Sequence, residues 1–102
     1  MHQRTIFFIS DGTGVTAETF GRAIMKQFDF STRAVRLPFI DSIDKAHQAV
    51  RQINHTAEVE GKKPIVFTTL VEPDTVAVVH EHCKGLVLDM FATFVQPLEE
   101  EL

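Results

Sequence analysis

Short apolar runs alternate with helical patterns along this chain. The first run, from Thr5 to Ile9, is apolar at nearly every position, as expected of a strand that is covered on both faces. After a glycine-containing turn, apolar residues recur at spacings of three and four from Ala17 to Phe28, which predicts an amphipathic helix. Such alternation is typical of repeated strand–helix units that build a parallel sheet.

The remaining pattern predicts three more strands and two more helices. The strands are expected at Thr32 to Leu37, Ile65 to Thr69 and Leu86 to Met90. The first of these looks like an edge strand, because two arginines interrupt it and Pro38 ends it. One helix is expected to begin after Asp41 or Ser42 and stop at Gly61, and the other to begin at Glu72-Pro-Asp and stop at Gly85.

The element order βαβαβαβ predicts an α/β fold. Right-handed crossovers and the edge character of the second strand favour an open three-layer sandwich, with a mostly parallel four-stranded sheet in the order 2-1-3-4, Rossmann-like or flavodoxin-like. Residues 1–102 are expected to form a single domain. Apolar residues occur from Phe91 to Leu98, after the fourth strand, and the predicted fold offers no surface for them to pack against. The fourth strand is expected to have an unpaired edge.

Composition narrows the classes of function. The chain has 102 residues, of which 44% are apolar and 24% charged, without a run near the ~20 apolar residues of a membrane helix. One cysteine, Cys83, suits a reducing compartment, so we expect a cytoplasmic protein. A net charge of −4 disfavours nucleic acid as a partner, and nine Phe with no Trp or Tyr weigh against flavin stacking.

The segment Ser10-Asp-Gly-Thr-Gly-Val-Thr16 is the main candidate for a site. It follows the first strand at the point where strand order reverses, and ligands of open α/β sheets bind there. Gly12 and Gly14 allow backbone N–H groups to approach an anion, and Thr13 and Thr16 offer hydroxyls beside a helix N-terminus. Asp11 would repel a phosphate directly, but it can accept a proton, orient a hydroxyl or hold Mg²⁺.

Other interpretations of this segment stay open. Two glycines among polar residues also suit an ordinary tight turn between a strand and a helix. The spacing of Gly12, Gly14 and Ala17 matches a loose dinucleotide pattern, with Asp41 or Arg36 as a distant ribose or 2′-phosphate contact. A P-loop is absent from these residues, because the pair Gly61-Lys62 has Thr56 and Lys63 where the motif needs Gly and Ser or Thr.

Further candidates lie at the ends of the third and fourth strands and in the third helix. Thr68, Thr69 and Asp89 would face the same crevice as Asp11, although each is also an ordinary strand-end or capping residue. His80 and Cys83 share one helix face while His82 points elsewhere, and two ligands make a poor zinc site. We therefore expect a core cysteine with solvated histidines and no resident metal.

The stretch from Arg4 to Thr19, RTIFFISDGTGVTAET, closely resembles the opening of the bacterial phosphoenolpyruvate synthase regulatory proteins. These are relatives of the plant pyruvate, phosphate dikinase regulatory protein. The resemblance continues through Phe39-Ile-Asp41, Pro64 to Thr69 and Leu86 to Phe91, and it spans the whole chain.

Membership of this family implies a bifunctional enzyme. It would phosphorylate a threonine of phosphoenolpyruvate synthase with ADP and remove that phosphate by phosphorolysis, forming pyrophosphate. Family members are longer, and their nucleotide-binding P-loop lies downstream. The resemblance therefore implies that this chain is an N-terminal domain, inactive without the P-loop domain. Alternatives are a docking module, a homodimerisation module, or a small phosphate- or nucleotide-binding flavodoxin-like domain.

Overall fold

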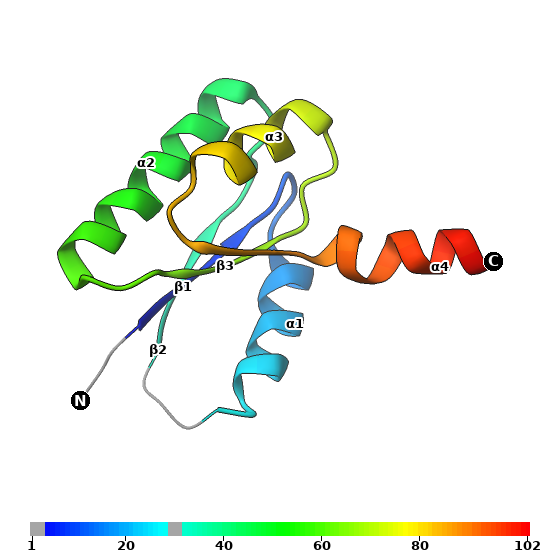
Figure 1. Cartoon of the computed structure of the whole chain (residues 1–102), viewed down its shortest axis with the longest axis horizontal. Coiled ribbons are helices and arrows are strands. Elements are labelled where there is room, and N and C mark those ends of the chain that lie inside the picture. Colours follow the sequence, from blue (N-terminus) through cyan, green and yellow to red (C-terminus); the bar gives the residue numbers. More distant parts are fainter. Residues whose placement is uncertain (1–3, 29–31) are drawn as a thin grey trace.

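The predicted sheet is present in the computed structural model, which describes residues 4–28 and 32–102. Its strands are β1 (Arg4–Ile9), β2 (Thr32–Leu37), β3 (Ile65–Thr68) and β4 (Leu86–Asp89). All neighbouring strands run parallel, and their order is β2-β1-β3-β4, which confirms the predicted topology (Figure 1). β1 and β3 therefore lie in the centre of the sheet. Their carboxyl ends lie at the same edge, beside the turn that follows β1.

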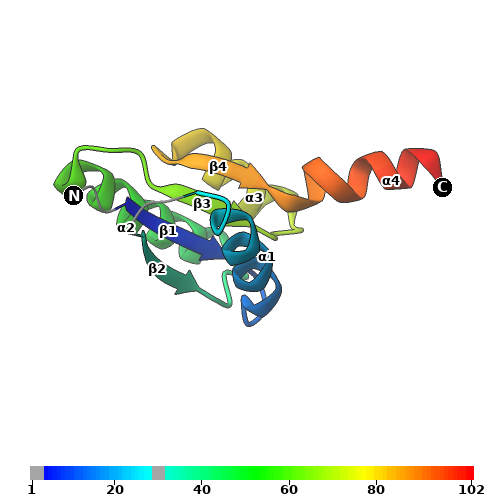
Figure 2. The same ribbon diagram turned by 90° about the horizontal axis from the view of Figure 1, so that it is seen from below.

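Three helices complete the layers. α1 (Val15–Met25) covers one face of the sheet, and α2 (Ile43–Glu60) and α3 (Pro73–His82) cover the other (Figure 2). From β1 the chain moves to one edge of the sheet to form β2, and it then moves back past β1 to form β3. Because right-handed crossovers in opposite directions lie on opposite faces, α1 lies on one face and α2 on the other. The result is the expected three-layer α/β sandwich.

Local sequence signals set the ends of α2 and α3. The Ser42 side chain accepts a hydrogen bond from the Lys45 N–H and caps α2, and Gly61 ends that helix with a left-handed φ of 68°. Pro73 occupies the first turn of α3, where its missing N–H costs nothing. Both starts agree with the prediction from the sequence.

The core has two halves, one on each face of the sheet. Phe7, Ile9 and Val66 pack with α2 and α3, whereas Phe8 and Phe67 pack with α1. A Cβ on Gly21 would lie only 2.5 Å from Phe8 Cε1, so this glycine lets α1 approach the sheet. The all-apolar character of β1 is explained by burial on both faces.

Several predicted boundaries were wrong by a few residues. β3 and β4 end at Thr68 and Asp89, one residue before the predicted ends. α1 stops at Met25, and Phe28 lies beyond it with 56% of its surface exposed. In the described ranges, 4–28 and 32–102, no helix combines the length and apolar character needed to cross a bilayer.

The chain after β4 forms a helical segment that the sequence pattern did not predict. It consists of a π-helical part, η1 (Phe91–Val95), and α4 (Gln96–Glu101), which extends away from the sheet (Figure 1). Pro97 lacks the N–H that would bond one turn back, and wide π-type turns directly before it accommodate that loss. All residues of α4 are exposed, so this segment adds little to the core.

Candidate functional site

The turn between β1 and α1 is held in place by the chain that follows β2. Ser10 donates its N–H to the Leu37 carbonyl at 3.2 Å, and Ile40 donates its N–H to the Ser10 carbonyl at 2.9 Å. Phe39 donates to the Gly12 carbonyl at 2.8 Å. The turn is thus bonded along one side by backbone groups, which fixes the positions of the side chains on the other side.

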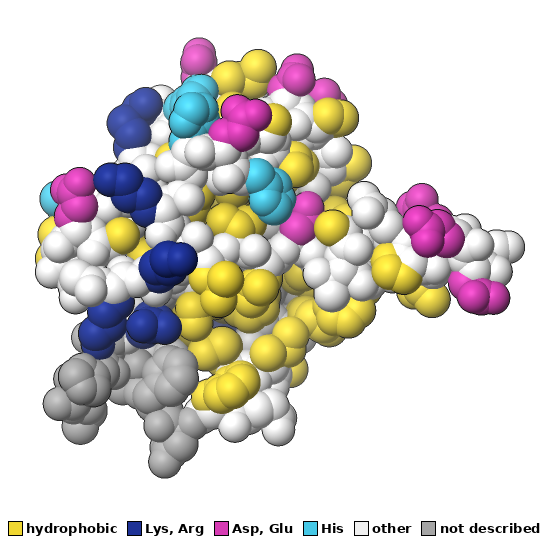
Figure 3. Space-filling view, in the orientation of Figure 1, with side chains coloured by type: hydrophobic (Ala, Val, Ile, Leu, Met, Phe, Trp, Pro, Cys, Tyr) yellow, Lys and Arg dark blue, Asp and Glu magenta, His cyan; other side chains and the backbone are white. Residues whose placement is uncertain are grey.

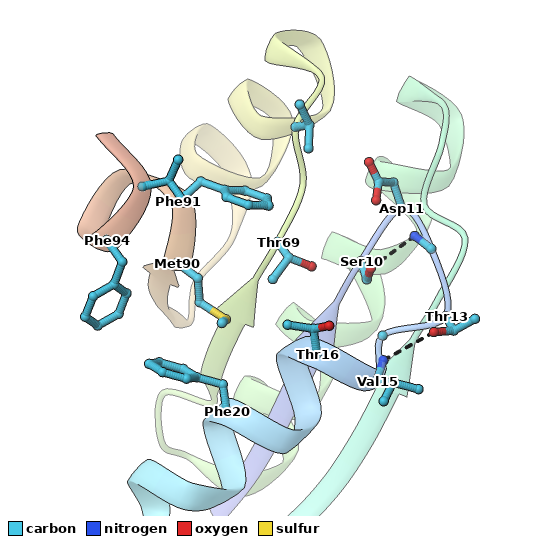
Figure 4. Close-up of a pocket in the computed structure, with 14 residues that line it drawn as sticks. Ser10, Asp11, Thr13, Val15, Thr16, Phe20, Thr69, Met90, Phe91 and Phe94 are labelled. Carbon is cyan, nitrogen blue, oxygen red and sulfur yellow. Dashed lines mark hydrogen bonds between the residues drawn. The ribbon is translucent and has the colours of Figure 1, made fainter. Parts of the chain in front are cut away.

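Side chains of the turn also bond to its own backbone. The Ser10 Oγ accepts from the Gly12 N–H at 3.0 Å, and the Thr13 Oγ1 accepts from the Val15 N–H at 3.4 Å (Figure 4). Gly14 is the N-cap of α1 with a φ of 87°, and it makes no side-chain capping bond. Thr13 therefore bonds to the first N–H group of α1, but α1 lacks the bond from an N-cap side chain that Ser42 gives α2.

An open cavity of about 510 Å³ lies against this turn. One side is formed by residues 10–16, and the other is apolar, with Phe20 from α1 and Phe91 and Phe94 from the segment after β4. Thr69 lies between the two sides (Figure 4). The cavity stands at the carboxyl ends of β1, β3 and β4, beside the reversal of strand order, where the sequence predicted a site.

Asp11 is exposed at the rim of the cavity. It is the sole ionisable residue among those that line it in the described part of the chain. Neither Arg36 nor Asp41, the distant contacts considered for a dinucleotide, belongs to this lining. Any acid–base chemistry by a cavity residue would therefore fall to Asp11.

The structure separates the other three strand-end candidates. Both threonines are buried, but Thr69 lines the cavity whereas the Thr68 Oγ1 accepts the Leu70 N–H at 3.2 Å. The Asp89 Oδ1 accepts the N–H groups of Phe91 at 2.9 Å and Ala92 at 3.1 Å, so it caps the helical segment after β4. Asp89 lines the neighbouring cavity of about 480 Å³ rather than the one beside Asp11.

A charged cluster lies on the outer side of α1. Glu18 accepts hydrogen bonds from Arg36 Nε at 2.8 Å and from Arg22 Nε at 2.7 Å. These bonds hold the pKa of the Glu18 carboxyl below its usual value, and the bond from Arg36 has the larger effect. The Arg36 stem passes so close to Gly14 that a Cβ there would lie 2.9 Å from its Cγ, so this arginine packs against the turn from outside the cavity.

One feature beside the turn was missed by reasoning from sequence. Phe39 has a φ of 59°, in the left-handed region that non-glycine residues rarely adopt. Its N–H bonds to the turn while its side chain is 54% exposed. Backbone strain of this kind gathers at functional sites, and nothing in the sequence Leu37-Pro-Phe-Ile40 signals it beyond the proline.

The third helix carries exposed histidines, as the sequence predicted, but it ends at His82 and not at Gly85, so Cys83 lies just beyond it as the C-cap residue. Cys83 packs against the core beneath α2 and α3, whereas His80 and His82 are exposed. Partial burial raises the pKa of the Cys83 thiol, which makes it a weaker nucleophile near neutral pH. Within the residues described, no three His, Cys, Asp or Glu side chains gather as metal ligands would.

The amino-acid sequence was compared with protein families and with known proteins. The model of a family described as kinase/pyrophosphorylase matches residues 6–102. Proteins whose names describe a phosphoenolpyruvate synthase regulatory protein are 72% identical in a Polaromonas species, 70% in Paracidovorax citrulli and 67% in Verminephrobacter eiseniae.

Each of these matches covers 100% of this chain and 37% of the relative, so the chain spans little more than a third of the length of these proteins. No solved structure shows a significant match.

Proposed function

This chain belongs to the kinase/pyrophosphorylase family, and we propose that it is the N-terminal part of a longer enzyme that regulates phosphoenolpyruvate synthase. In the forward reaction, a threonine oxygen of the target attacks the β-phosphorus of ADP and AMP leaves. In the reverse reaction, inorganic phosphate takes the phosphoryl group from the threonine and pyrophosphate is formed. The names of the relatives support the target, and the family description supports a kinase activity and a pyrophosphorylase activity.

The ADP site belongs, in this proposal, to a P-loop outside residues 1–102. The pair Gly61-Lys62 in this chain closes a helix, because Gly61 is the C-cap of α2. A P-loop glycine instead precedes a helix whose N-terminal N–H groups hold phosphate. Phosphoryl transfer depends on positioning and electrostatic stabilisation from all of its parts, so this chain alone is expected to be inactive.

The turn from Ser10 to Thr16 supplies one side of the catalytic crevice in this proposal. The observation that carries it is the open cavity at the reversal of strand order, with a single carboxylate, Asp11, at its rim. Asp11 would accept the proton of the target hydroxyl or hold a Mg²⁺ ion that is bound to substrate phosphates. One carboxylate with nearby hydroxyls fits the latter, because Mg²⁺ in phosphoryl-transfer sites often takes only one or two protein ligands.

The proposed activity is tested by incubating phosphoenolpyruvate synthase with ADP and either the full-length protein or this chain. Phosphothreonine is measured by mass spectrometry, and pyrophosphate release is measured after inorganic phosphate is added. We expect both reactions with the full-length protein and neither with this chain. ADP-dependent phosphorylation by this chain alone would refute the assignment of the nucleotide site to the missing part.

Gly12→Ala tests the turn independently of Asp11. Gly12 has no positive φ, and an added Cβ would meet no atom nearer than Ser10 Oγ at 3.9 Å, so the fold does not require glycine there. We expect unchanged thermal stability and a lower rate of phosphoryl transfer in the full-length protein, because a methyl group would hinder close approach of substrate to the turn. Unchanged rates would argue that the turn is purely structural.

A docking or self-association module is the second candidate function. Leu86 and Leu88 of β4 pair with Ile65 and Phe67, which places them on the α1 face of the sheet, and they are 49% and 39% exposed. Figure 3 shows hydrophobic side chains gathered on this side of the molecule. Light scattering of this chain, followed by titration with phosphate, separates the candidates. A dimer that ignores phosphate favours the module, and a monomer that binds phosphate favours the site.

A further inference from the structure

The α1 face of the sheet is covered over only part of its width. α1 packs on β1 and β3, where Phe8 and Phe67 are buried beneath it. The neighbouring residues of β4 on this face are Leu86 and Leu88, and they stay 49% and 39% exposed. The described part of the chain thus leaves β4 uncovered beside α1, whereas α2 and α3 share the opposite face.

A groove of about 150 Å³ lies between α1 and the segment that follows β4, and its walls are almost entirely apolar. Asp89 is the one ionisable residue of the described lining, and its Oδ1 already accepts the N–H groups of Phe91 and Ala92. We call this groove and the adjoining strand the β4 patch, which consists of Phe20, Ile24, Leu86, Leu88, Met90 and Phe94. Exposed apolar side chains that gather in this way indicate a surface that another polypeptide segment covers.

The helical segment that leads away from the β4 patch is also apolar on one side. Phe94, Leu98 and Leu102 follow one another at intervals of four residues, so they lie on one face of the helix. Phe94 and Leu98 are 48% and 56% exposed. A helix as short as residues 91–101 is marginal in water unless an apolar face packs on a partner. The described chain supplies no such partner for α4, whose residues are all exposed.

We propose that the part of the full-length protein after Leu102 packs on the β4 patch and on the apolar side of α4, and so completes the layer that α1 begins. The inference rests on the proposed function in one respect, namely that this chain is the N-terminal part of a longer enzyme. The relatives have ample length for such a segment, because the matches cover only 37% of each. The segment presents apolar side chains to the patch, since a charge there would find no partner.

The point of attachment favours this occupant over a second copy of the chain or a separate protein. Met90 packs with the α1-side core, and Phe94 contacts Phe20 with ring centroids 5.2 Å apart. From there α4 adds only about 9 Å, at about 1.5 Å per residue. Whatever follows Leu102 is therefore tethered beside the patch, and a short tether gives an effective concentration in the millimolar range. A separate molecule would need a similar concentration to compete.

Hydrogen–deuterium exchange of the full-length protein tests this packing without any need for activity. Amides of α4 should exchange at least about tenfold more slowly in wild type than in Leu86→Lys or Leu98→Lys, because each substitution places a charge in the buried contact. Lysine suits the last turn of a helix, so Leu98→Lys does not weaken α4 by itself. Amides of α2 should stay protected in every variant, which shows that the fold is kept.

Val59→Lys is the matched control, because Val59 is 71% exposed near the end of α2, on the opposite side of the sheet. It should leave the exchange of α4 at the wild-type rate. If wild-type α4 amides exchanged as fast as those of Leu86→Lys and Leu98→Lys, the inference would be overturned.

Two further results would overturn it. Protection of α4 that disappears on dilution would make a second copy the occupant, and protection that appears only with added phosphoenolpyruvate synthase would make that protein the occupant.

The same experiment separates the inference from the proposed activity. Protection of α4 at every concentration of the full-length protein supports the contact even if no ADP-dependent phosphorylation is observed, in which case only the activity is refuted. Phosphorylation by a full-length protein whose α4 amides exchange rapidly would refute the contact and leave the activity standing.

Discussion

Phe20 of α1 and Phe94 of η1 meet edge to face, with ring centroids 5.2 Å apart and planes inclined by 75°. This contact joins the first helix to the segment after β4, although 73 residues lie between the two rings in the sequence. The apolar side of the cavity therefore depends on both ends of the chain. A truncation before Phe91 would keep the turn from Ser10 to Thr16 and remove the wall opposite it.

Gly21→Ala is expected to destabilise the chain. Alanine favours a helix by about 1 kcal/mol over glycine, but the new Cβ would lie 2.5 Å from Phe8 Cε1 and 2.9 Å from Phe67 Cδ2. Overpacking of two buried rings outweighs that gain, so we expect the free energy of unfolding to fall by about 1–2 kcal/mol in urea titrations.

Thr19→Ala is the control for this substitution, because Thr19 lies on the exposed side of the same helix. It should leave stability unchanged or raise it by a few tenths of a kcal/mol. If Gly21→Ala raised stability as much as Thr19→Ala does, α1 would not pack as closely on the sheet as described.

The cluster around Glu18 predicts a dependence of stability on acid pH. Hydrogen bonds from Arg36 and Arg22 lower the pKa of Glu18 in the folded chain. A carboxyl with a lowered folded pKa stabilises the fold above its unfolded pKa, and this contribution is lost as the pH falls through the folded pKa. Thermal melts should therefore show wild type above Glu18→Gln at neutral pH, with the two converging in acid.

Salt provides the check on that interpretation. Both arginines of the cluster are exposed to solvent, so added salt should shrink the difference between wild type and Glu18→Gln at neutral pH. A difference that persists unchanged at low pH would mean that packing of the Glu18 side chain, and not its charge, stabilises the chain.

Cys83 is expected to react slowly with thiol reagents. Its pKa is raised by partial burial, so less thiolate is present near neutral pH than in an unfolded chain. Labelling with iodoacetamide at mildly alkaline pH should accelerate markedly when urea unfolds the protein. Equal rates in the folded and unfolded chain would contradict the packing of Cys83 against the core.

Much of the fold could be predicted from local pattern. The fully apolar β1, the Ser42 and Gly61 ends of α2 and Pro73 at the start of α3 are all set by short-range chemistry, and right-handed crossovers then give the strand order. The helical segment after Asp89 was not predicted, because the local pattern does not show which surface its apolar residues pack against. Their position depends on long-range contacts such as that between Phe94 and Phe20.

The candidate site was predictable in its polar half only. The turn from Ser10 to Thr16 carries a recognisable composition, and strand order places it at the edge of the sheet where ligands bind. The sequence did not separate Thr69, which lines the cavity, from Thr68 and Asp89, which bond to nearby backbone N–H groups. Side-chain direction at a strand end depends on the final pleat, which a shift of one residue reverses.

The role of Asp11 is tested most directly by the turnover of the full-length protein with Asp11→Asn beside Asp44→Asn, an exposed carboxylate on α2 away from the cavity. Turnover is measured as ADP-dependent phosphorylation of phosphoenolpyruvate synthase, and stability as the melting temperature of each variant. We predict that Asp11→Asn lowers kcat by about 100-fold or more with an unchanged melting temperature, whereas Asp44→Asn keeps wild-type turnover. Equal turnover in wild type and Asp11→Asn would contradict a catalytic role for this carboxylate.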